Sequence, residues 1–170
     1  MVVDSAHDLA HLDRVWMNAS MIANGSGDSW VLMAASYLHD LVNLPKNDPN
    51  RELASRQSAE KAAPYLVSLG FSPIQIKTTQ HAIAAHSFSA GIAPETFEAK
   101  VLRDADRLDS LGAIGIARTF LVAGAIGLPL YDPTDPFAQN RVLDDGKYSL
   151  DHWQIKLLKL PDGMITDRGQ

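Results

Sequence analysis

Three stretches of the sequence place histidine or aspartate inside otherwise apolar helical patterns. The first is HDLAHLDRV, in which His7 and His11 lie four residues apart and therefore on one face of a helix. The second is AASYLHDLV, where His39 and Asp40 are adjacent, and the third is VLRDADRLDSLGAIG, where three aspartates interrupt the pattern. Charged and imidazole groups are costly to bury without partners, so these positions are candidates for chemistry.

Each of these features also has a purely structural interpretation. A single histidine in a helix usually packs or bonds a backbone group, and a His-Asp pair can cap a helix or belong to a surface ion pair. The combination is more informative, because a helical bundle can bring such faces together around a metal ion. Imidazole and carboxylate together suit Mn, Fe, Co, Ni or Zn rather than Cu(I) or an iron–sulfur cluster. Spacing alone leaves the metal site and the structural interpretation about equally supported.

The order of the motifs, H…HD…D, resembles the HD-domain phosphohydrolase superfamily. The strings SAHDLAHLDRV, YLHDLVNLPK, HAIAAHSFSAG and DADRLDSLGAIGIAR resemble a bacterial branch of small, mostly uncharacterised HD hydrolases, and the match runs from Asp4 to about Leu160. Members usually carry a further helical stretch before the first motif, whereas only six residues precede His7 here. How far the first helix is covered by other parts of the protein therefore stays open. The resemblance implies that the metal is held by His11, His39, Asp40 and Asp106.

Helix geometry limits the choice among the aspartates of the third motif. Asp104 and Asp106 are two residues apart, about 200° around a helix, so they cannot both face one ion. The family pattern selects Asp106 as the ligand. We expect Asp104 and Asp109 to support the ligands from behind or to join helices, and His7 could hydrogen-bond behind His11.

The activity that the resemblance implies is hydrolysis of a phosphate ester or anhydride, with nucleotides as the leading substrate class. The cofactor would be one divalent ion, Mn by expectation, with Fe, Ni, Co, Zn or Mg as alternatives. Such an ion would lower the pKa of a bound water and polarise the P–O bond, so that the water can attack phosphorus in line. Two other functions stay open: a non-catalytic nucleotide-binding or regulatory module on the same fold, and di-iron oxygenase chemistry, which needs a second metal.

Further residues could act on the substrate side of such a site. His81 and His86 lie five apart in HAIAAHSFS. They could contact the phosphate or protonate the leaving group, ligate a second metal, or be half-buried helix histidines without a catalytic role. Three cations near the motifs are candidate phosphate holders, and each could equally be a surface charge or part of a structural ion pair: Lys46, Arg14 and Arg107.

The elements that would position these residues are helices. Patterning with a period of 3.6 dominates the chain, and no run of strand alternation is convincing. Asp28 and Ser72 would each begin a helix, and Pro64 would kink or break another. We expect one all-α helical bundle of the HD-domain type over residues 1–170, with its core at about 4–127 and an irregular connection at 128–147. The pattern predicts helices over residues 9–22, 29–42, 51–69, 73–86, 96–111 and 150–160.

The most apolar window, residues 111–130, is interrupted by Arg118 and has a proline near its end. It therefore falls short of the roughly 18 uninterrupted apolar residues of a membrane span. We expect a buried core helix there, with Gly112 and Gly115 bending the chain before it. The small residues of this window are not preceded by a predicted strand, and the lysine of a Walker motif is missing. They therefore indicate close helix packing rather than a glycine-rich nucleotide-binding loop. This helix and the long connection after it could serve a homodimer.

Composition excludes several other classes of function. The 170 residues, 46% of them hydrophobic, suffice for one domain whose hydrophobic core needs no added cross-links for stability. Cysteine is absent, which excludes disulfides, thiol catalysis and thiolate metal sites and fits a reducing compartment. A net charge of −5 without a long basic run argues against an extended nucleic-acid groove, so we expect a small phosphorylated partner. The charged N-terminal stretch does not read as a signal peptide, and we expect a cytoplasmic protein with no membrane contact.

Overall fold

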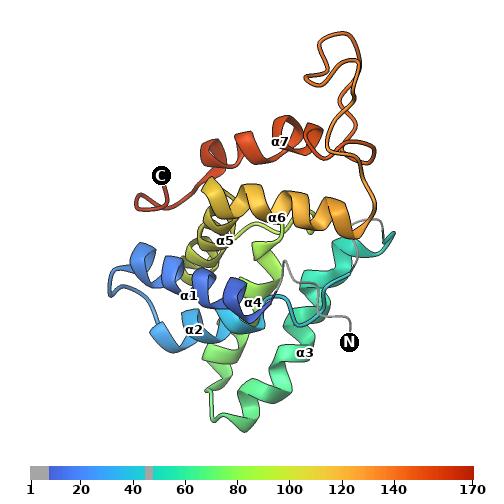
Figure 1. Cartoon of the computed structure of the whole chain (residues 1–170). Helices are drawn as coiled ribbons and strands as arrows, with labels where there is room; N and C mark the ends of the chain where they lie inside the picture. Colours follow the sequence, from blue (N-terminus) through green and yellow to red (C-terminus); the bar gives the residue numbers. More distant parts are fainter. Residues whose placement is uncertain (1–7, 45–47) are drawn as a thin grey trace.

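The computed structural model describes residues 8–44 and 48–170, and over these residues it contains helices, turns and loops but no strand (Figure 1). The predicted all-α class is therefore confirmed. The α-helices are α1 (Leu9–Ala23), α2 (Ser29–Leu38), α3 (Ala54–Ser68), α4 (Pro73–His86), α5 (Phe97–Asp109), α6 (Gly112–Ala125) and α7 (Asp151–Ile155). Short 3₁₀ helices span Arg51–Leu53, Leu157–Lys159 and Pro161–Gly163.

Two of the helices begin at the capping residues that the sequence predicts. The Asp28 carboxylate accepts hydrogen bonds from the backbone N–H groups of Trp30 and Val31 at the start of α2. Ser72 and Gln75 form a reciprocal capping box at the start of α4, which has a proline in its first turn. These side chains satisfy N–H groups that have no partner inside the helix. Both predicted helix starts are confirmed.

The second helix is shorter than its pattern predicts. The helix expected over residues 29–42 ends at Leu38, and His39 and Asp40 lie in the turn that follows. The backbone N–H of Leu41 bonds to the Leu38 carbonyl, a three-residue spacing that belongs to a turn rather than to an α-helix. In a continued helix the two site residues would point about 100° apart. The turn frees them from that constraint.

Two other expectations about helix breaks are also corrected. Pro64 lies inside α3 without ending it. The proline costs one backbone hydrogen bond, but α3 packs along α4 and buries Leu66 completely, which offsets that loss. The helix expected over residues 150–160 ends at Ile155, because the backbone of Lys156 takes φ −129° and ψ −60°, outside the helical range. The chain continues there in 3₁₀ turns.

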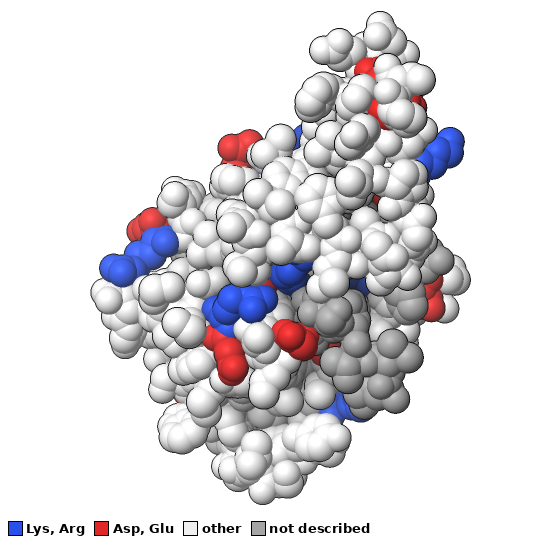
Figure 2. Space-filling view, in the orientation of Figure 1, with Lys and Arg blue, Asp and Glu red and all other residues white. Residues whose placement is uncertain are grey.

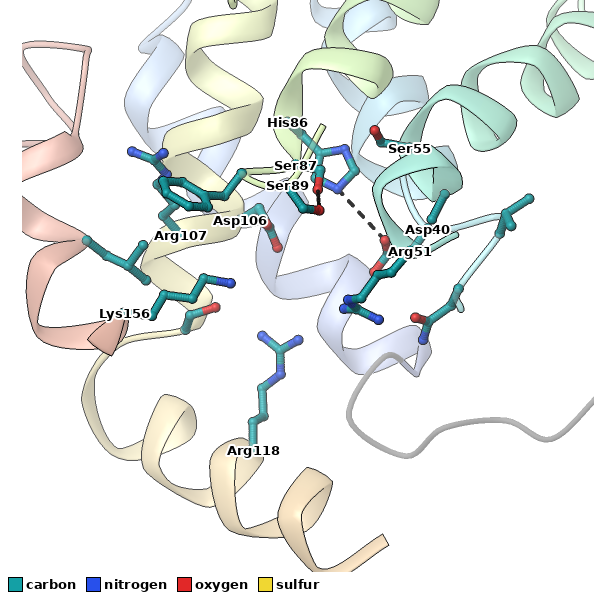
Figure 3. Close-up of a pocket in the computed structure, with 16 residues that line it drawn as sticks. Asp40, Arg51, Ser55, His86, Ser87, Ser89, Asp106, Arg107, Arg118 and Lys156 are labelled. Carbon is teal, nitrogen blue, oxygen red and sulfur yellow. Dashed lines mark hydrogen bonds and ion pairs between the residues drawn. The ribbon is translucent and has the colours of Figure 1, made fainter. Parts of the chain in front are cut away.

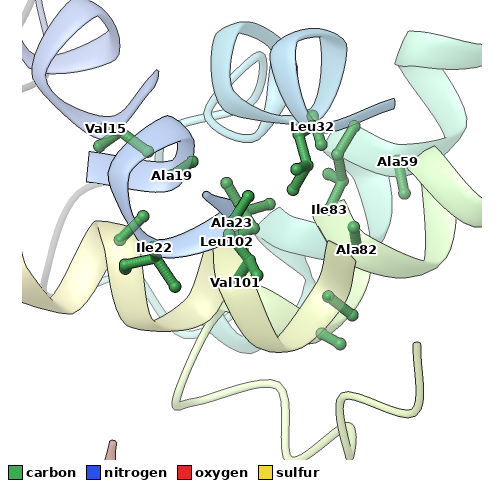
Figure 4. Packing of buried hydrophobic residues seen from close by; sticks show 14 of the residues in the cluster. Val15, Ala19, Ile22, Ala23, Leu32, Ala59, Ala82, Ile83, Val101 and Leu102 are labelled. Atoms are coloured by element: carbon green, nitrogen blue, oxygen red, sulfur yellow. The ribbon is translucent and has the colours of Figure 1, made fainter. Parts of the chain in front are cut away.

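The core is built from one face of each of the helices α1 to α5. Helix α5 packs against α1 and α4, α4 packs also on α3 and α2, and the contacting side chains interlock between them (Figure 4). Leu102 of α5 is completely buried, and Asp106 follows it by four residues on the same helix face. The apolar face of α5 therefore continues into the region of the predicted site. Other completely or almost completely buried side chains of this core are Val15, Leu32, Leu66 and Ile83.

Helix α6 is not the buried core helix that its composition predicts. Of its residues only Gly115 and Ala123 are buried, whereas Ile114, Ile116 and Leu121 are 46, 42 and 44% exposed. Helix α6 turns away from α5 by 74°, so it lies on the outside of the bundle and contacts little beyond α5. In the described part of the chain, no single helix is long and apolar enough to cross a membrane, and α5 with α6 would pass that test only as a bent pair.

The connection between α6 and α7 projects from the helical body as an extended loop (Figure 1). Over residues 128–147 it contains no helix, as expected. Its base is fixed by Arg141, whose guanidinium donates to both carboxylate oxygens of the buried Asp151. The ring of Tyr148 lies 4.5 Å below the same guanidinium. The chain then returns through α7 to the side of α5.

Candidate metal centre

The four predicted metal ligands converge where α1, the turn after α2 and α5 meet. His11 comes from the first turn of α1 and Asp106 from the last turn of α5. The His11 Nε2 atom lies 3.3 Å from His39 Nε2 and 3.7 Å from both Asp40 Oδ2 and Asp106 Oδ1. The His39 Nε2 atom lies 3.4 Å from Asp40 Oδ2 and 3.9 Å from Asp106 Oδ1. Residues that are far apart in the sequence thus form one compact cluster.

The distances from each of the two histidines fit a metal ion. Two sets of possible ligand atoms lie within 4.8 Å of one another: His11 with His39 and Asp106, and His39 with Asp40 and His86. Two ligand atoms that each bind an ion at about 2.1 Å can lie at most about 4.2 Å apart. All the separations from His11 Nε2 and His39 Nε2 fall below this limit. Two imidazoles and two carboxylates form a donor set that suits a divalent ion of the Mn-to-Zn series. The residues present therefore fit the group that the sequence resemblance implies.

Hydrogen bonds behind the imidazoles determine which ring nitrogen faces the cluster. His11 Nδ1 lies 2.8 Å from Asp109 Oδ2, and the Nδ1 atoms of His39 and His86 lie 2.8 and 2.6 Å from backbone carbonyl oxygens three residues earlier. Carbonyl and carboxylate oxygens accept hydrogen bonds, so each Nδ1 donates and each neutral ring directs an Nε2 lone pair into the cluster. Without a cation between them, the facing lone pairs of His11 and His39 would repel each other.

Asp109 holds His11 in this orientation. It is almost completely buried, and its carboxylate accepts hydrogen bonds from His11, Arg14 and Arg118. Burial alone would raise the pKa of Asp109, but these donors outweigh it and lower the pKa to about 2. The carboxylate is therefore ionised at neutral pH and keeps the proton on His11 Nδ1. Asp109 lies behind His11 and contacts it, and Arg14, which could have been a phosphate holder, a surface charge or part of an ion pair, forms an ion pair with Asp109.

The metal-facing carboxylate of Asp106 is also held in its ionised form. Burial favours its neutral form, but the positive charge that His39, His86 and His11 carry when they are protonated lowers its pKa below the ordinary value, and a cation in the same place would act in the same direction. An ionised carboxylate is the form that binds a metal ion.

His86 reaches the cluster from the end of α4, whereas His81 does not. The His86 Nε2 atom lies 3.8 Å from Asp40 Oδ1, and the His86 ring is 4.8 Å from the His39 ring, centre to centre. Burial, and then the neighbouring His39, lower the pKa of His86, so the ring is neutral at pH 7. With Nδ1 as donor, its Nε2 can accept a proton or bind a metal but cannot protonate a leaving group. The His81 Nε2 atom instead accepts a hydrogen bond from the backbone N–H of Glu95 at 3.0 Å.

The second-metal alternative depends on a second group of possible ligands. The side chains of His39, Asp40 and His86 each offer one atom, and these atoms lie within 4.8 Å of one another. The Nδ1 of His39 already donates to a carbonyl, so only Nε2 is available for a metal. The group with His11 and the group with His86 would both need His39 Nε2 as a ligand. They therefore cannot both be complete at once, and the arrangement favours one ion.

A pocket of about 140 Å³ opens beside the cluster (Figure 3). The side chains of Arg51, Arg118 and Lys156 point into it, facing the side on which Asp40 and Asp106 lie. Such an arrangement places positive charge around any anion that reaches the metal ligands. Hydroxyl groups contribute further polar lining, from Ser55, Ser87, Ser89 and Ser110.

The charges on the face shown in Figure 2 agree with a small anionic ligand. A few basic side chains gather near the centre of this face beside acidic ones, and most of the surrounding surface is uncharged (Figure 2). An extended nucleic-acid groove would need a long track of Lys and Arg instead.

The remaining predicted residues lie elsewhere or are committed to other contacts. Lys46 and His7 lie outside the described residues. Arg107 borders the pocket, and its Nη1 donates to the carbonyl of Gly163 at 2.5 Å. Arg51 has a structural partner of the same kind, because its Nη1 donates to the carbonyl of Leu44. Asp104 points to the other side of α5, where its carboxylate accepts hydrogen bonds from the C-terminal residues. The two aspartates of this motif thus face different directions, as helix geometry requires.

Sequence reasoning did not single out Arg51, Arg118 or Lys156 as site residues. Arg118 is the only charge in an apolar helix, and that isolation is itself a signal that a charged group has a specific partner. Lys156 carries no such signal, because the pattern places it in the middle of a helix that ends before it. Only the three-dimensional arrangement reveals its position.

Comparison with known proteins gives consistent matches. The model of the HD domain family matches residues 8–111, a range that includes all four converging ligands. The uncharacterised protein YpgQ of Bacillus subtilis is 33% identical over 168 residues, which cover 96% of this chain and 74% of YpgQ.

Solved structures give the same result. The crystal structure of YpgQ in complex with ADP matches with a TM-score of 0.70 and 33% identity, covering 98% of this chain and 79% of that one. A Lactobacillus plantarum structure matches with a TM-score of 0.73 and 27% identity over 98% of this chain and 78% of that one. A structure described as an HD-superfamily hydrolase from Bacillus thuringiensis matches with a TM-score of 0.66 and 34% identity over 96% of this chain and 74% of that one.

Proposed function

The chain belongs to the HD-domain family, and on that premise we propose that it is a metal-dependent phosphohydrolase acting on a phosphate ester or anhydride of a nucleotide. The observation that carries the proposal is the convergence of His11, His39, Asp40 and Asp106 beside a pocket lined by cationic side chains. Groups that could hold a metal ion and groups that could neutralise a phosphate thus lie in one place, which supports the proposal.

The roles of the residues follow from their geometry. The Nε2 lone pairs of the two histidines and the carboxylates of the two aspartates would hold one divalent ion, which we propose to be Mn²⁺. Such an ion would lower the pKa of a coordinated water and polarise a phosphoryl oxygen. His86, with an unprotonated Nε2 near Asp40, would accept the proton from the attacking water.

The pocket would supply substrate-binding energy in addition to that of the metal ion. Phosphoryl transfer needs positioning and neutralisation of charge more than covalent chemistry from the protein. Arg51, Arg118 and Lys156 would neutralise the phosphate oxygens, and the serine hydroxyls of the pocket would donate hydrogen bonds to them. Arg118 also bonds Asp109, which links the phosphate side of the pocket to the support of His11.

The relatives support a nucleotide as substrate. The structure of YpgQ is a complex with ADP, and the Bacillus thuringiensis relative is described as a hydrolase of the HD superfamily. The residues that converge in this chain lie inside the matched range. We therefore extend the nucleotide ligand and the hydrolase activity to this chain as a proposal.

A chelator-controlled substrate screen tests the proposal. The purified chain would be stripped with EDTA and resupplied separately with Mn²⁺, Mg²⁺, Co²⁺, Ni²⁺, Zn²⁺ or Fe²⁺, and release of phosphate or pyrophosphate would be measured from nucleoside mono-, di- and triphosphates. We expect hydrolysis only with added metal, and none by an Asp106→Ala variant. Absence of hydrolysis with every ion, combined with thermal stabilisation by ADP, would favour a non-catalytic binding module instead. Two tightly bound iron ions per chain would favour oxygenase chemistry.

We also propose that the chain forms a homodimer. The apolar side chains that α6 exposes, among them Ile114 and Leu121, support this proposal because exposed apolar surface favours association. Light scattering on the purified protein would give about twice the chain mass of 18.5 kDa for a dimer. A mass of one chain at micromolar concentration would contradict it.

A further inference from the structure

We infer that residues 151–170, here called the C-terminal segment, form one wall of the substrate pocket, and that Lys156 binds a phosphate group of the substrate from this wall. The segment lies beyond residues 8–111, the part of the chain that matches the family model. The inference rests on the proposed phosphohydrolase function, and it assigns a substrate-binding residue outside the metal-binding motifs.

The position of Lys156 follows from a break in the chain direction. Helix α7 ends at Ile155, and the non-helical backbone of Lys156 turns the chain into the next 3₁₀ helix. Figure 3 shows the Lys156 side chain reaching into the pocket toward the guanidinium of Arg118. Leu160, which is buried, borders the same pocket. Lys156 lines the same pocket as Arg51 and Arg118, so the ammonium group adds to the positive charge that would surround an anion bound there.

Asp104 fastens the C-terminal segment to α5. Its carboxylate is completely buried, and it accepts hydrogen bonds from the backbone N–H of Ile165 at 3.0 Å and of Thr166 at 2.7 Å. The Thr166 hydroxyl donates to the same carboxylate at 2.7 Å. All these donors belong to the C-terminal segment. A buried carboxylate without donors is costly, so the protein favours the state in which the segment is attached.

A second attachment lies one turn further along α5. Arg107 donates from Nη1 to the carbonyl of Gly163. A Cβ atom at Gly163 would lie 2.7 Å from that nitrogen, so a larger residue there would displace the end of the Arg107 side chain. Asp104 and Arg107 flank the metal-facing Asp106 on the same helix. Helix α5 therefore fixes Lys156, through the segment, relative to the metal ligands.

The structure thus gives Lys156 and Asp104 distinct roles. Lys156 is a substrate-binding residue that contacts phosphate, and Asp104 is a positioning residue that acts only through the segment. Loss of either should weaken substrate binding while leaving the metal ligands in place. Such a result separates this wall from the metal centre.

The test compares Lys156→Gln with Lys159→Gln, because Lys159 is three residues further along the same segment, is exposed and does not line the pocket. The probes are Mn²⁺ alone and ADP in the presence of Mn²⁺, both titrated by calorimetry into the full chain. We expect K156Q to weaken ADP binding about tenfold, the order expected for one charge-assisted contact, and to leave Mn²⁺ binding within twofold of wild type. K159Q should match wild type in both titrations.

Asp104→Asn provides the second variant. It should raise amide hydrogen exchange in residues 157–169 and weaken ADP binding as K156Q does, again with unchanged Mn²⁺ affinity. If D104N does not fold, Thr166→Val removes one of the same hydrogen bonds with a milder change. In steady-state kinetics on a hydrolysed nucleotide, K156Q and D104N should raise KM more than they lower kcat.

The outcomes distinguish this inference from the function on which it rests. Wild-type protein that binds ADP while K156Q binds it equally well overturns the inference alone. Wild-type protein that neither binds ADP with Mn²⁺ nor hydrolyses any nucleotide overturns the proposed function and, with it, the role of Lys156.

Discussion

Asp109 Oδ2 lies 2.8 Å from His11 Nδ1, although the two residues are 98 positions apart in the chain. This contact joins the last turn of α5 to the first turn of α1 and leaves His11 Nε2 directed toward His39, Asp40 and Asp106. The same carboxylate also accepts hydrogen bonds from the guanidinium groups of Arg14 and Arg118. One buried side chain thus orients His11, links two helices and connects the cluster of possible metal ligands to Arg118, which lines the pocket.

Removing the charge of Asp109 should loosen the metal. In Asp109→Asn the amide oxygen can still accept a hydrogen bond, but it neither holds the His11 proton as strongly nor balances the two arginines. We expect the dissociation constant for Mn²⁺ to rise about 10–100-fold, the range typical of residues that support a metal ligand. Calorimetric titration of the chelated protein measures it. Asp13→Asn is the matched control, since Asp13 is exposed and its carboxylate accepts a hydrogen bond from the Tyr37 hydroxyl. Equal affinities of wild type and D109N would contradict the role of Asp109.

The two histidines of α4 should separate in their effects. His86→Ala should lower kcat by about 10²–10⁴-fold, as expected for loss of a group that accepts a proton in the reaction. His81→Ala should change kcat less than twofold, because its Nε2 bonds the Glu95 backbone instead of reaching the pocket. Metal content by elemental analysis should stay near one ion per chain in both variants. Loss of half the bound metal in H86A would support the second-metal alternative.

The apolar face that leads to the site should carry a large share of stability. Leu102 is completely buried on α5, four residues before Asp106, and truncation to alanine should lower the free energy of unfolding by about 2–5 kcal/mol. Leu158→Ala, at a position that is 64% exposed, should change it by less than about 0.5 kcal/mol. Urea unfolding of both variants in EDTA provides the comparison. Similar losses in the two would show that the core does not run along this face.

The loop between α6 and α7 should respond to acid at its base. Hydrogen bonds from the Thr134 side chain and backbone lower the pKa of Asp132 to about 2, from an ordinary value of 3.8. Since the folded-state pKa is depressed, the stabilisation by this carboxylate is complete above about pH 4 and is lost as the pH falls toward 2. Carbon NMR of the Asp132 carboxyl group should show a titration midpoint near 2. Thr134→Val, which removes the side-chain donor, should raise that midpoint, and a midpoint near 3.8 in the wild type would contradict this account.

Much of the fold could be predicted because the information is local. Asp28 and Ser72 begin helices through side-chain bonds to residues two or three positions away, and period-3.6 patterns mark the faces that pack. Pro64 shows the limit of such signals, since tertiary packing keeps α3 continuous through it. Helix α6 shows another limit. Its apolar composition predicts burial. Whether an apolar helix is buried depends on whether the other helices leave it a surface to pack on, and the helical pattern of the sequence does not show this.

The convergence of His11, His39, Asp40 and Asp106 could be predicted because the family resemblance supplies their pairing across distant helices. The pocket cations could not, because their positions depend on where the chain turns. Lys156 reaches the pocket because α7 ends one residue before it, and Arg118 does so because its side chain extends from α6 to Asp109 at the end of α5. His81 was predicted on equal terms with His86, yet a spacing of five residues places the two on different helix faces.

The central claim is that His11, His39, Asp40 and Asp106 share one ion, and anomalous diffraction from crystals grown with Mn²⁺ tests it most directly. Data collected at the manganese edge should show one strong peak within about 2.3 Å of both histidine Nε2 atoms and of one oxygen of each aspartate. Crystals saturated with Mn²⁺ that show no peak among these four side chains, or a peak held by other residues, would contradict the account.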